Sequence, residues 1–133
     1  MPYELTFTKL VPITDPDLYF NECCIGGDVV LERLLPIIRA RYSDIETNQE
    51  DWGWFVWFES EGTKLAVDIF CDNPGKGDFR VHLTSSVQSL MFWLKVVDTA
   101  ELEHLRALAV DALSSWIGVS PKVERLSSKY LPI

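Results

Sequence analysis

His82 is the residue of this chain that suits catalysis best, because an imidazole can accept and return a proton near neutral pH. Strand alternation places His82 on one sheet face with Asp68, which would orient the ring, and with Thr84, a candidate nucleophile. Cys71 would be the stronger nucleophile, but the same alternation turns it to the opposite face. An open sheet also gives Thr84 no pocket. Catalysis is therefore the alternative, and binding the main hypothesis.

Aromatic side chains share this face with charged ones. We expect eight binding residues there: Phe55, Trp57, Asp68, Phe70, Arg80, His82, Trp93 and Lys95. Large exposed aromatic area is unusual on a monomer, and Trp and Arg dominate binding hot spots. Asp68 with Arg80 also suits a structural ion pair. We expect the face to be covered by a second copy of the chain, by another protein, or by the chain's own residues 12–25 or its C-terminal tail.

Metal and cofactor signals are weak in this sequence. His82 and His104 are the only histidines, and no HxH, HxxxH or CxxC spacing occurs, so we expect no metal and no cofactor. Residues 75–77 (GKG) lack the Ser or Thr and the helix of a phosphate loop, and indicate a hairpin turn. The adjacent Cys23 and Cys24 suit a redox or soft-metal site, but small apolar residues before a helix are the favoured interpretation.

The charge of the chain limits its partners. The formal net charge is −8 and no cluster of Lys or Arg interrupts it, so we expect neither nucleic acid nor a membrane surface as a partner. Four acids lie close together without a base among them: Asp44, Glu46, Glu50 and Asp51. We expect residues 43–51 to form a loop that is either simply solvated or docks a basic partner.

The size and composition indicate one globular domain covering residues 1–133. The chain has 133 residues, 47% of them hydrophobic, which is enough to build an ordinary core. Its longest apolar stretches, 52–58 and 90–94, are far shorter than the ~20 residues of a membrane helix. The first residues alternate and include Glu4, unlike a secretory leader. The three cysteines are interpreted as free thiols, and we therefore expect the protein to be located in the cytoplasm.

The first third of the sequence predicts one strand and one helix. Residues 3–11 alternate between apolar and polar side chains, and Pro12 ends the strand. Asp28 is a good N-cap for a helix that continues to Tyr42, with apolar residues at helical spacing. Pro36 lies inside this helix, where it removes one backbone hydrogen bond, so we expect a kink or a break there.

A four-stranded antiparallel meander follows. Its predicted strands are residues 53–60, 63–71, 78–85 and 89–97. Turn-forming residues separate these strands, the last of them at 85–88. Residues 98–101 (DTAE) match a capping box, and the helix that follows should end at Gly118. A short strand at 122–126 comes last.

This order predicts an α+β fold, an antiparallel sheet built on the meander with two helices packed on one face, and order β-α-β-β-β-β-α-β. The first and last strands would add at the sheet edges. A hairpin turning at residues 61–62 sets three cross-strand pairs: Trp57 with Ala66, Phe55 with Asp68, and Glu59 with Lys64. The next hairpin can place Asp68 beside Arg80 or His82. Alternation gives the helix side ten uncharged residues: Trp54, Val56, Phe58, Leu65, Val67, Ile69, Cys71, Phe79, Val81 and Leu83.

The function we expect is that of a small, non-enzymatic, acidic protein-binding domain that also self-associates as a homodimer. An immunity-type inhibitor of a basic enzyme and a chaperone for a basic secreted protein are two versions of this hypothesis. The alternative is a small-molecule-binding domain or enzyme that uses Trp57, Asp68, Arg80 and His82. A concave pocket at these residues would favour the alternative, and a flat patch would favour protein binding.

Overall fold

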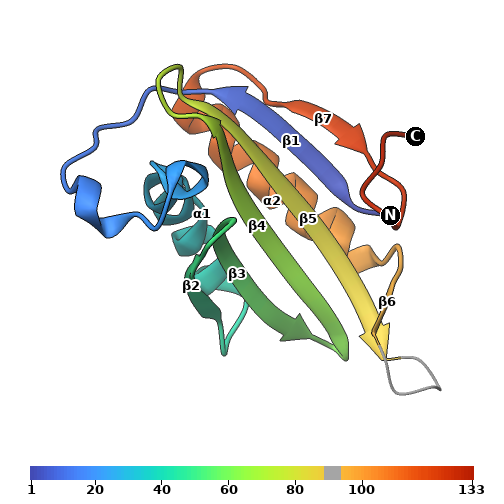
Figure 1. Ribbon diagram of the computed structural model, residues 1–133. Helices are drawn as coiled ribbons and strands as arrows, with labels where there is room; N and C mark the ends of the chain where they lie inside the picture. Colours follow the sequence, from blue (N-terminus) through green and yellow to red (C-terminus); the bar gives the residue numbers. More distant parts are fainter. Residues whose placement is uncertain (89–93) are drawn as a thin grey trace.

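A computed structural model of the chain describes residues 1–88 and 94–133. In this described part, seven strands form one antiparallel sheet and two helices pack on one face of it (Figure 1). The strands are β1 (Tyr3–Thr8), β2 (Glu46–Glu50), β3 (Gly53–Ser60), β4 (Thr63–Asn73), β5 (Asp78–Gln88), β6 (Leu94–Val96) and β7 (Lys122–Arg125). The helices are α1 (Gly27–Arg41) and α2 (Ala100–Ile117), and the short 3-10 turns η1 (Pro16–Leu18) and η2 (Glu22–Cys24) precede α1. The predicted α+β fold is confirmed.

The strand order across the sheet is β2-β3-β4-β5-β1-β7, with β6 paired to the last part of β5. β7 lies at an edge as predicted, but β1 lies inside the sheet between β5 and β7, so the prediction of an edge position for β1 is wrong. The reason is that Tyr3, Leu5 and Phe7 are all buried. This strand is therefore as apolar on its inner side as the strands of the meander.

The hairpin of β3 and β4 has the predicted register. Glu61 and Gly62 both adopt left-handed backbone angles, with φ of 52° and 80°, which gives the two-residue turn that matches the twist of a hairpin. All three predicted cross-strand pairs are present: Trp57 with Ala66, Phe55 with Asp68, and Glu59 with Lys64. On the other side of β4, Asp68 lies opposite His82, one of the two predicted arrangements.

β2 corrects the prediction of a loop at residues 43–51. Glu46–Glu50 pairs along β3 from Trp57 to Gly53 and forms one edge of the sheet. Gln49 is buried and its side-chain amide donates to the Leu18 carbonyl and accepts from the Phe20 amide, both at 3.0 Å. Strand pairing and this amide contact hold a polar segment that has no apolar side of its own to indicate a strand.

The C-terminal part of the meander also differs from the prediction. No turn interrupts residues 85–88, because β5 continues through them to Gln88. Ser85 is buried and donates its hydroxyl to the Val97 carbonyl at 2.6 Å, which explains why a Ser-rich segment remains in the strand. Of the predicted strand 89–97, the described residues show only Leu94–Val96 as strand. Trp93 lies outside the described residues.

The helix α1 begins at Gly27, two residues earlier than the predicted Asp28 N-cap implies. Gly26 precedes it with a left-handed φ of 81°, and Asp28 lies in the first turn, where it accepts a hydrogen bond from the Tyr19 hydroxyl at 2.6 Å. The predicted Asp28 cap is therefore wrong. The helix continues through Pro36 without a break, since Pro36 is exposed and the carbonyl that it leaves unbonded can be hydrated.

The helix α2 ends at Gly118 as predicted, but its N-cap is Thr99, one residue after the Asp98 cap that the predicted capping box implies. The Thr99 hydroxyl accepts the Leu102 amide at 3.1 Å, and Gly118 ends the helix with a φ of 90°. Neither α2 nor any other described helix is long and apolar enough to cross a membrane. Leu102, Leu105 and Leu113 are fully buried, because this side of α2 packs against the sheet.

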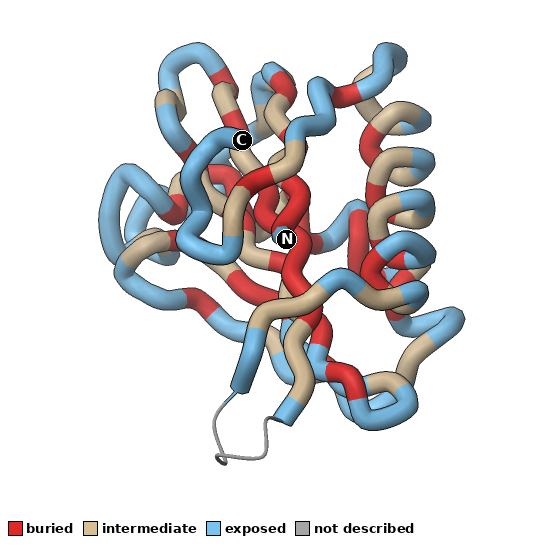
Figure 2. The backbone as a smooth tube through the Cα atoms, turned by 90° about the vertical axis from the view of Figure 1, so that its right-hand side faces the viewer, coloured by how far each residue is buried: buried red, intermediate tan, exposed pale blue. Residues whose placement is uncertain are grey.

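The core lies between the helices and the sheet. Figure 2 shows the buried positions in the strands and on the helix side that faces them. All ten residues predicted on the helix side of the meander belong to this core or pack against it. Charged side chains are absent from the core cluster of the described residues, so its stability rests on apolar burial.

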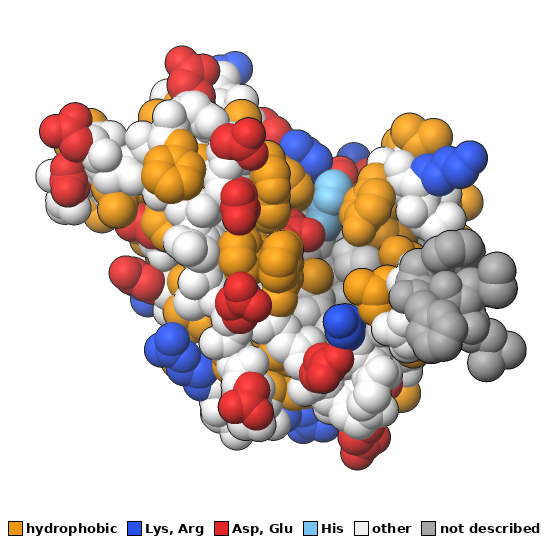
Figure 3. Space-filling model, turned by 60° about the horizontal axis from the view of Figure 1, so that its bottom comes forward, with side chains coloured by type: hydrophobic (Ala, Val, Ile, Leu, Met, Phe, Trp, Pro, Cys, Tyr) orange, Lys and Arg blue, Asp and Glu red, His pale blue; other side chains and the backbone are white. Residues whose placement is uncertain are grey.

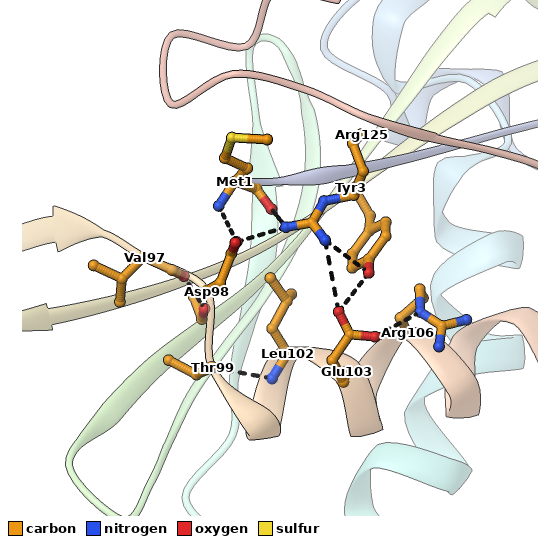
Figure 4. Close-up of polar contacts among 10 residues, drawn as sticks. Met1, Tyr3, Val97, Asp98, Thr99, Leu102, Glu103, Arg106 and Arg125 are labelled. Atoms are coloured by element: carbon orange, nitrogen blue, oxygen red, sulfur yellow. Dashed lines mark hydrogen bonds and ion pairs between the residues drawn. The ribbon is translucent and has the colours of Figure 1, made fainter. Parts of the chain in front are cut away.

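A polar cluster fastens β1 and β7 to the start of α2 (Figure 4). Arg125 of β7 lies 4.1 Å over the Tyr3 ring and donates to the Tyr3 hydroxyl at 2.9 Å. Arg125 also pairs with Asp98 at 2.5 Å, and Tyr3 donates to Glu103 on α2. These contacts join the first strand, the last strand and the second helix at one end of the sheet.

Candidate functional site

The sheet face turned away from the helices is called the open face here. Its residues in β2 to β6, assigned from the strand register, include Glu46, Asn48, Glu50, Phe55, Trp57, Glu59, Lys64, Ala66, Asp68, Phe70, Arg80, His82, Thr84, Ser86, Leu94 and Val96. Figure 3 shows the molecule from below, hollowed between two ridges, with acidic side chains beside hydrophobic ones along one ridge. Two adjoining parts of this face carry the candidate sites.

The predicted binding residues come together with two exceptions. Six of them lie on the open face: Phe55, Trp57, Asp68, Phe70, Arg80 and His82. Lys95 does not, because it lies opposite Val87, whose side chain belongs to the helix side of β5. The strand alternation that we expected for residues 89–97 was off by one position there, and Leu94 takes the place on the open face. Trp93 is outside the described part of the chain.

The four predicted acidic residues divide between a strand and its ends. Glu46 and Glu50 belong to β2 and extend from the open face, with Glu46 directly opposite Trp57. Asp44 precedes β2 with a left-handed φ of 55°, and Asp51 follows it in the turn to β3. Part of the predicted acidic loop is thus an edge strand. Its pairing with β3 brings the Glu46 carboxylate beside Trp57, although the two residues are eleven positions apart in the sequence.

Among the predicted aromatic residues that the structure describes, Trp57 is the most exposed. Its side chain is 40% exposed, whereas Phe55 beneath it is only 2% exposed. The two rings stack with centroids 3.9 Å apart, and the indole N–H donates to the Asp68 carboxylate at 3.1 Å. One face of the indole is therefore held by a ring and its edge by a hydrogen bond. The remaining surface of the indole is exposed to solvent in a fixed orientation.

A groove of about 670 Å³ runs along the open face beside Trp57. The residues that line it are Ser43, Asp44, Glu46, Trp57, Phe58, Glu59, Lys64, Leu65, Ala66, Thr84, Ser86 and Leu94. Three carboxylates and one ammonium group stand around its aromatic floor, so the local charge is negative like that of the whole chain. Such a groove attracts a cationic group and offers it an indole to lie against.

His82 is buried at the centre of the face, with 6% of its surface exposed. Its Nε2 atom lies 2.9 Å from a Glu4 carboxylate oxygen, so Nε2 carries the proton and donates it. Burial lowers the pKa of His82 more than the Glu4 hydrogen bond raises it. The contact is therefore a hydrogen bond of a neutral imidazole. Sequence reasoning missed Glu4, although its place on the polar side of an alternating strand was a signal.

Asp68 and Arg80 do not form the ion pair that their types suggested. Arg80 instead donates from two nitrogen atoms to the Asp72 carboxylate, at 3.2 Å each. Asp68 keeps only the Trp57 N–H among the described contacts, and burial raises its pKa despite that hydrogen bond. A carboxylate with this environment is poorly compensated by the fold itself.

The residues of the enzyme alternative do not assemble around His82. Cys71 is buried on the helix side, and burial raises the pKa of its thiol to about 11. The Thr84 hydroxyl lies 3.4 Å from the Tyr130 hydroxyl, and no described contact joins Thr84 to the imidazole. Within residues 1–88 and 94–133, no three His, Cys, Asp or Glu side chains converge as they would to bind a metal.

Part of the open face is covered by the chain's own tail, as one of our three expectations allowed. After β7, the Ser127 amide donates to the Leu131 carbonyl at 2.7 Å, and this turn places Tyr130 over His82 with ring centroids 5.4 Å apart. Residues 12–25 lie elsewhere, because Cys24 accepts the N–H of Trp54 on the helix side at 2.9 Å. The predicted cover by residues 12–25 is wrong.

The adjacent cysteines have different environments. Cys24 is buried, and its thiol donates to the Glu50 carbonyl at 3.0 Å. Cys23 is exposed beside it, and all three cysteines are free thiols. The favoured interpretation of Cys24 as a small packing residue before α1 agrees with this geometry.

The fold and the site together define a two-layer α+β domain whose open face carries an aromatic, acid-lined groove. Comparisons with protein-family models, curated proteins and solved structures found no match to this chain. The function is therefore inferred from the groove and its chemistry alone.

Proposed function

We propose that this chain is a non-enzymatic, acidic protein-binding domain that captures a basic segment of a partner protein in the open-face groove. The observation that carries the proposal is Trp57, a 40% exposed indole fixed by Phe55 and Asp68 and lying opposite Glu46. Exposed Trp side chains in fixed orientations are frequent hot spots of protein recognition. The groove also has a volume of about 670 Å³, which is enough to hold several side chains of a peptide segment.

The charge distribution supports a basic partner. The net charge of −8 would steer a cationic protein toward the domain at long range. At short range, a Lys or Arg side chain lying on Trp57 would have Glu46 across the strand pair and Glu59 two residues along β3. A cation over an indole contributes about 0.5–2 kcal/mol, and flanking carboxylates add to it.

Two biological versions fit this chemistry, an immunity-type inhibitor of a basic enzyme and a chaperone for a basic secreted protein. Proteins of both kinds bind their partners by surface complementarity and catalyse no reaction. We place this function in the cytoplasm, where the three free thiols would stay reduced. Self-association of the chain through the same face is part of the proposal, because a second copy would cover Trp57 as well.

The test is calorimetric titration of the purified domain with a lysine- and arginine-containing peptide and with a matched peptide that carries glutamine at the basic positions. We expect only the basic peptide to bind, and Trp57→Ala to abolish that binding. The exposed α2 residue Asp111 supplies the control, since Asp111→Asn removes one charge far from the groove. Equal affinity for wild type, Trp57→Ala and Asp111→Asn would show attraction by net charge alone and would contradict the proposal.

Stability measurements keep this test free of folding artefacts. Trp57→Ala should lower the free energy of unfolding by only about 1 kcal/mol, mainly through the lost hydrogen bond to Asp68. Trp54→Ala should lower it by about 3–5 kcal/mol, because Trp54 packs on the core and donates to the Cys24 carbonyl. Urea unfolding measures both values. Equal losses would mean that Trp57 is a packing residue.

A further inference from the structure

A second, smaller pocket opens on the same face where the tail crosses it. It has a volume of about 270 Å³ and is lined by Trp52, Asp68, Phe70, His82 and Tyr130, and it is called the Asp68 pocket here. These residues come from the turn before β3, from β4, from β5 and from the C-terminal tail. Four of the five are aromatic rings and the fifth is a carboxylate.

The rings are arranged around the pocket in contact with one another. Trp52 and Phe70 have centroids 5.3 Å apart and are tilted by 40°. Phe70 meets His82 edge to face at 5.1 Å, and Tyr130 stacks on His82 at 5.4 Å. Each ring therefore supports its neighbour, and the walls of the Asp68 pocket are formed before any ligand arrives.

The charges around the pocket leave one carboxylate without a cation. Arg80 lies 4.4 Å over the Phe70 ring, but both Asp72 oxygens already compensate its charge. His82 is neutral and donates to Glu4. Asp68 accepts the Trp57 N–H and has no ion pair within the residues that the structure describes. Asp68 thus gives the lining of the pocket a carboxylate whose charge no neighbouring cation in the described part of the chain balances.

We propose that the Asp68 pocket binds an alkylammonium group, either the trimethylammonium head of a small molecule or an alkylated lysine side chain. Aromatic faces attract such a cation through their quadrupoles, and its methyl groups fill apolar space that water fills poorly. The Asp68 carboxylate supplies the opposite charge at one side. The inference goes beyond the proposed function, because this pocket would bind the cation whether or not the groove binds a protein.

Other ligand classes suit the pocket less well. An anion would meet the carboxylates of Asp68 and Glu4. A neutral apolar group would bury Asp68 further without compensating its charge, which is unfavourable. A metal ion requires several oxygen, nitrogen or sulfur ligands, and the pocket offers one carboxylate and one imidazole that is already hydrogen-bonded.

The experiment uses three probes on the full chain. Choline carries the trimethylammonium group, 3,3-dimethylbutanol is its neutral isostere, and a short peptide with trimethyl-lysine presents the same group on a protein. Binding is followed by NMR from the indole N–H signal of Trp52, assigned with Trp52→Phe. We expect choline to bind with at least about tenfold higher affinity than the neutral isostere. The relative affinities of choline and the peptide identify the source of the cation.

Two substitutions test the residues of the pocket. Asp68→Asn keeps the shape and the hydrogen bond from Trp57 but removes the charge, and it should weaken choline binding about tenfold. Tyr130→Ala should weaken it as well if Tyr130 is a wall of the pocket, whereas Asp111→Asn on α2 should not change it. Thermal unfolding confirms that each variant is folded.

Four results would overturn the inference. The neutral isostere binding as tightly as choline would show a merely apolar pocket, and equal choline affinity in Asp68→Asn would remove the carboxylate from the site. Tighter binding by Tyr130→Ala would mean that the tail fills the pocket and does not form its wall. Absence of choline binding to wild type at millimolar concentration would exclude the site. None of these results depends on the basic peptide of the groove, so the two proposals fail separately.

Discussion

Single residues of β4 show that acid content alone does not mark a binding site. Asp72, near the end of the strand, takes two hydrogen bonds from Arg80 and is compensated within the fold. Asp68, four residues earlier, accepts only an indole N–H among the described contacts. The first carboxylate stabilises a strand pair, while the second retains a charge that a ligand can compensate. The proposal for the Asp68 pocket therefore rests on the difference between the paired Asp72 and the unpaired Asp68 among the described contacts.

His82 predicts a pH dependence of stability. Burial lowers its pKa in the folded protein below the ordinary value of 6.5. As the pH falls through 6.5, the unfolded chain gains a proton that folded His82 does not yet bind, so the free energy of unfolding decreases. Each unit by which the two pKa values differ corresponds to about 1.4 kcal/mol. Urea unfolding at several pH values below neutrality measures this loss.

The variant His82→Gln isolates this effect, because glutamine can still donate to Glu4 but does not titrate. We expect its stability to decrease less than that of wild type on acidification. His104→Gln serves as the control, since His104 is an exposed residue of α2 and the substitution should leave the wild-type dependence unchanged. A wild-type protein that becomes more stable than His82→Gln at low pH would show instead a charged His82–Glu4 ion pair.

At the scale of the elements, Gly53 allows β3 and β4 to pair closely at the start of the hairpin. Its φ is 152°, and a Cβ atom added there would lie 2.0 Å from the Ile69 carbonyl oxygen of β4. Gly53→Ala should therefore lower the free energy of unfolding by about 3 kcal/mol or more. The reason is that the new methyl group would overlap the Ile69 carbonyl oxygen unless β3 and β4 move apart. Thermal or urea unfolding measures the loss.

Gly62 provides the matched control for this substitution. It has a left-handed φ of 80° in the turn between the same two strands, but no atom lies within 4 Å of an added Cβ. Gly62→Ala should lower the stability by only about 1–2 kcal/mol, from backbone strain alone. Similar losses of stability in the two variants would show that the close contact between Gly53 and β4 costs nothing beyond backbone strain.

The strands that could be predicted from sequence are those whose side chains alternate. Trp54, Val56 and Phe58 on one side of β3 indicated the strand, and the turn at residues 61–62 set its register with β4. β2 has no such pattern, since Glu46–Glu50 is polar throughout and is held by pairing with β3. Tertiary contacts of this kind leave no periodic signal in the sequence.

At the scale of the whole molecule, the site residues that were predicted lie on neighbouring strands of one hairpin, whereas those that were missed reach the site through tertiary contacts. Asp68 and His82 could be placed together because one hairpin joins their strands. Glu4 and Tyr130 reach His82 from opposite ends of the chain, and sequence alternation cannot choose among strands so far apart. Trp52 begins the apolar stretch 52–58, but only the turn before β3 brings it to Phe70. The open face was predictable from alternation, whereas the pocket that Trp52 and Tyr130 help to line was not.

The whole-molecule charge of −8 makes the two proposed occupants of the open face respond oppositely to salt. Binding of a basic peptide should weaken as salt is added, because screening reduces attraction between unlike charges. Self-association brings two acidic faces together, so it should strengthen with salt. By light scattering we expect the mass to rise from one chain toward two between about 0.05 M and about 0.5 M salt.

The matched variant for this measurement is Trp57→Glu, which places a further carboxylate at the centre of the open face. We expect it to retain the mass of one chain at every salt concentration, because a dimer would bury that charge against its own copy. The basic peptide should also reduce the wild-type mass to one chain, since both occupants need the Trp57 surface. A wild-type dimer that dissociates in salt, or one that Trp57→Glu leaves intact, would locate self-association on another surface and leave the groove to the heterologous partner alone.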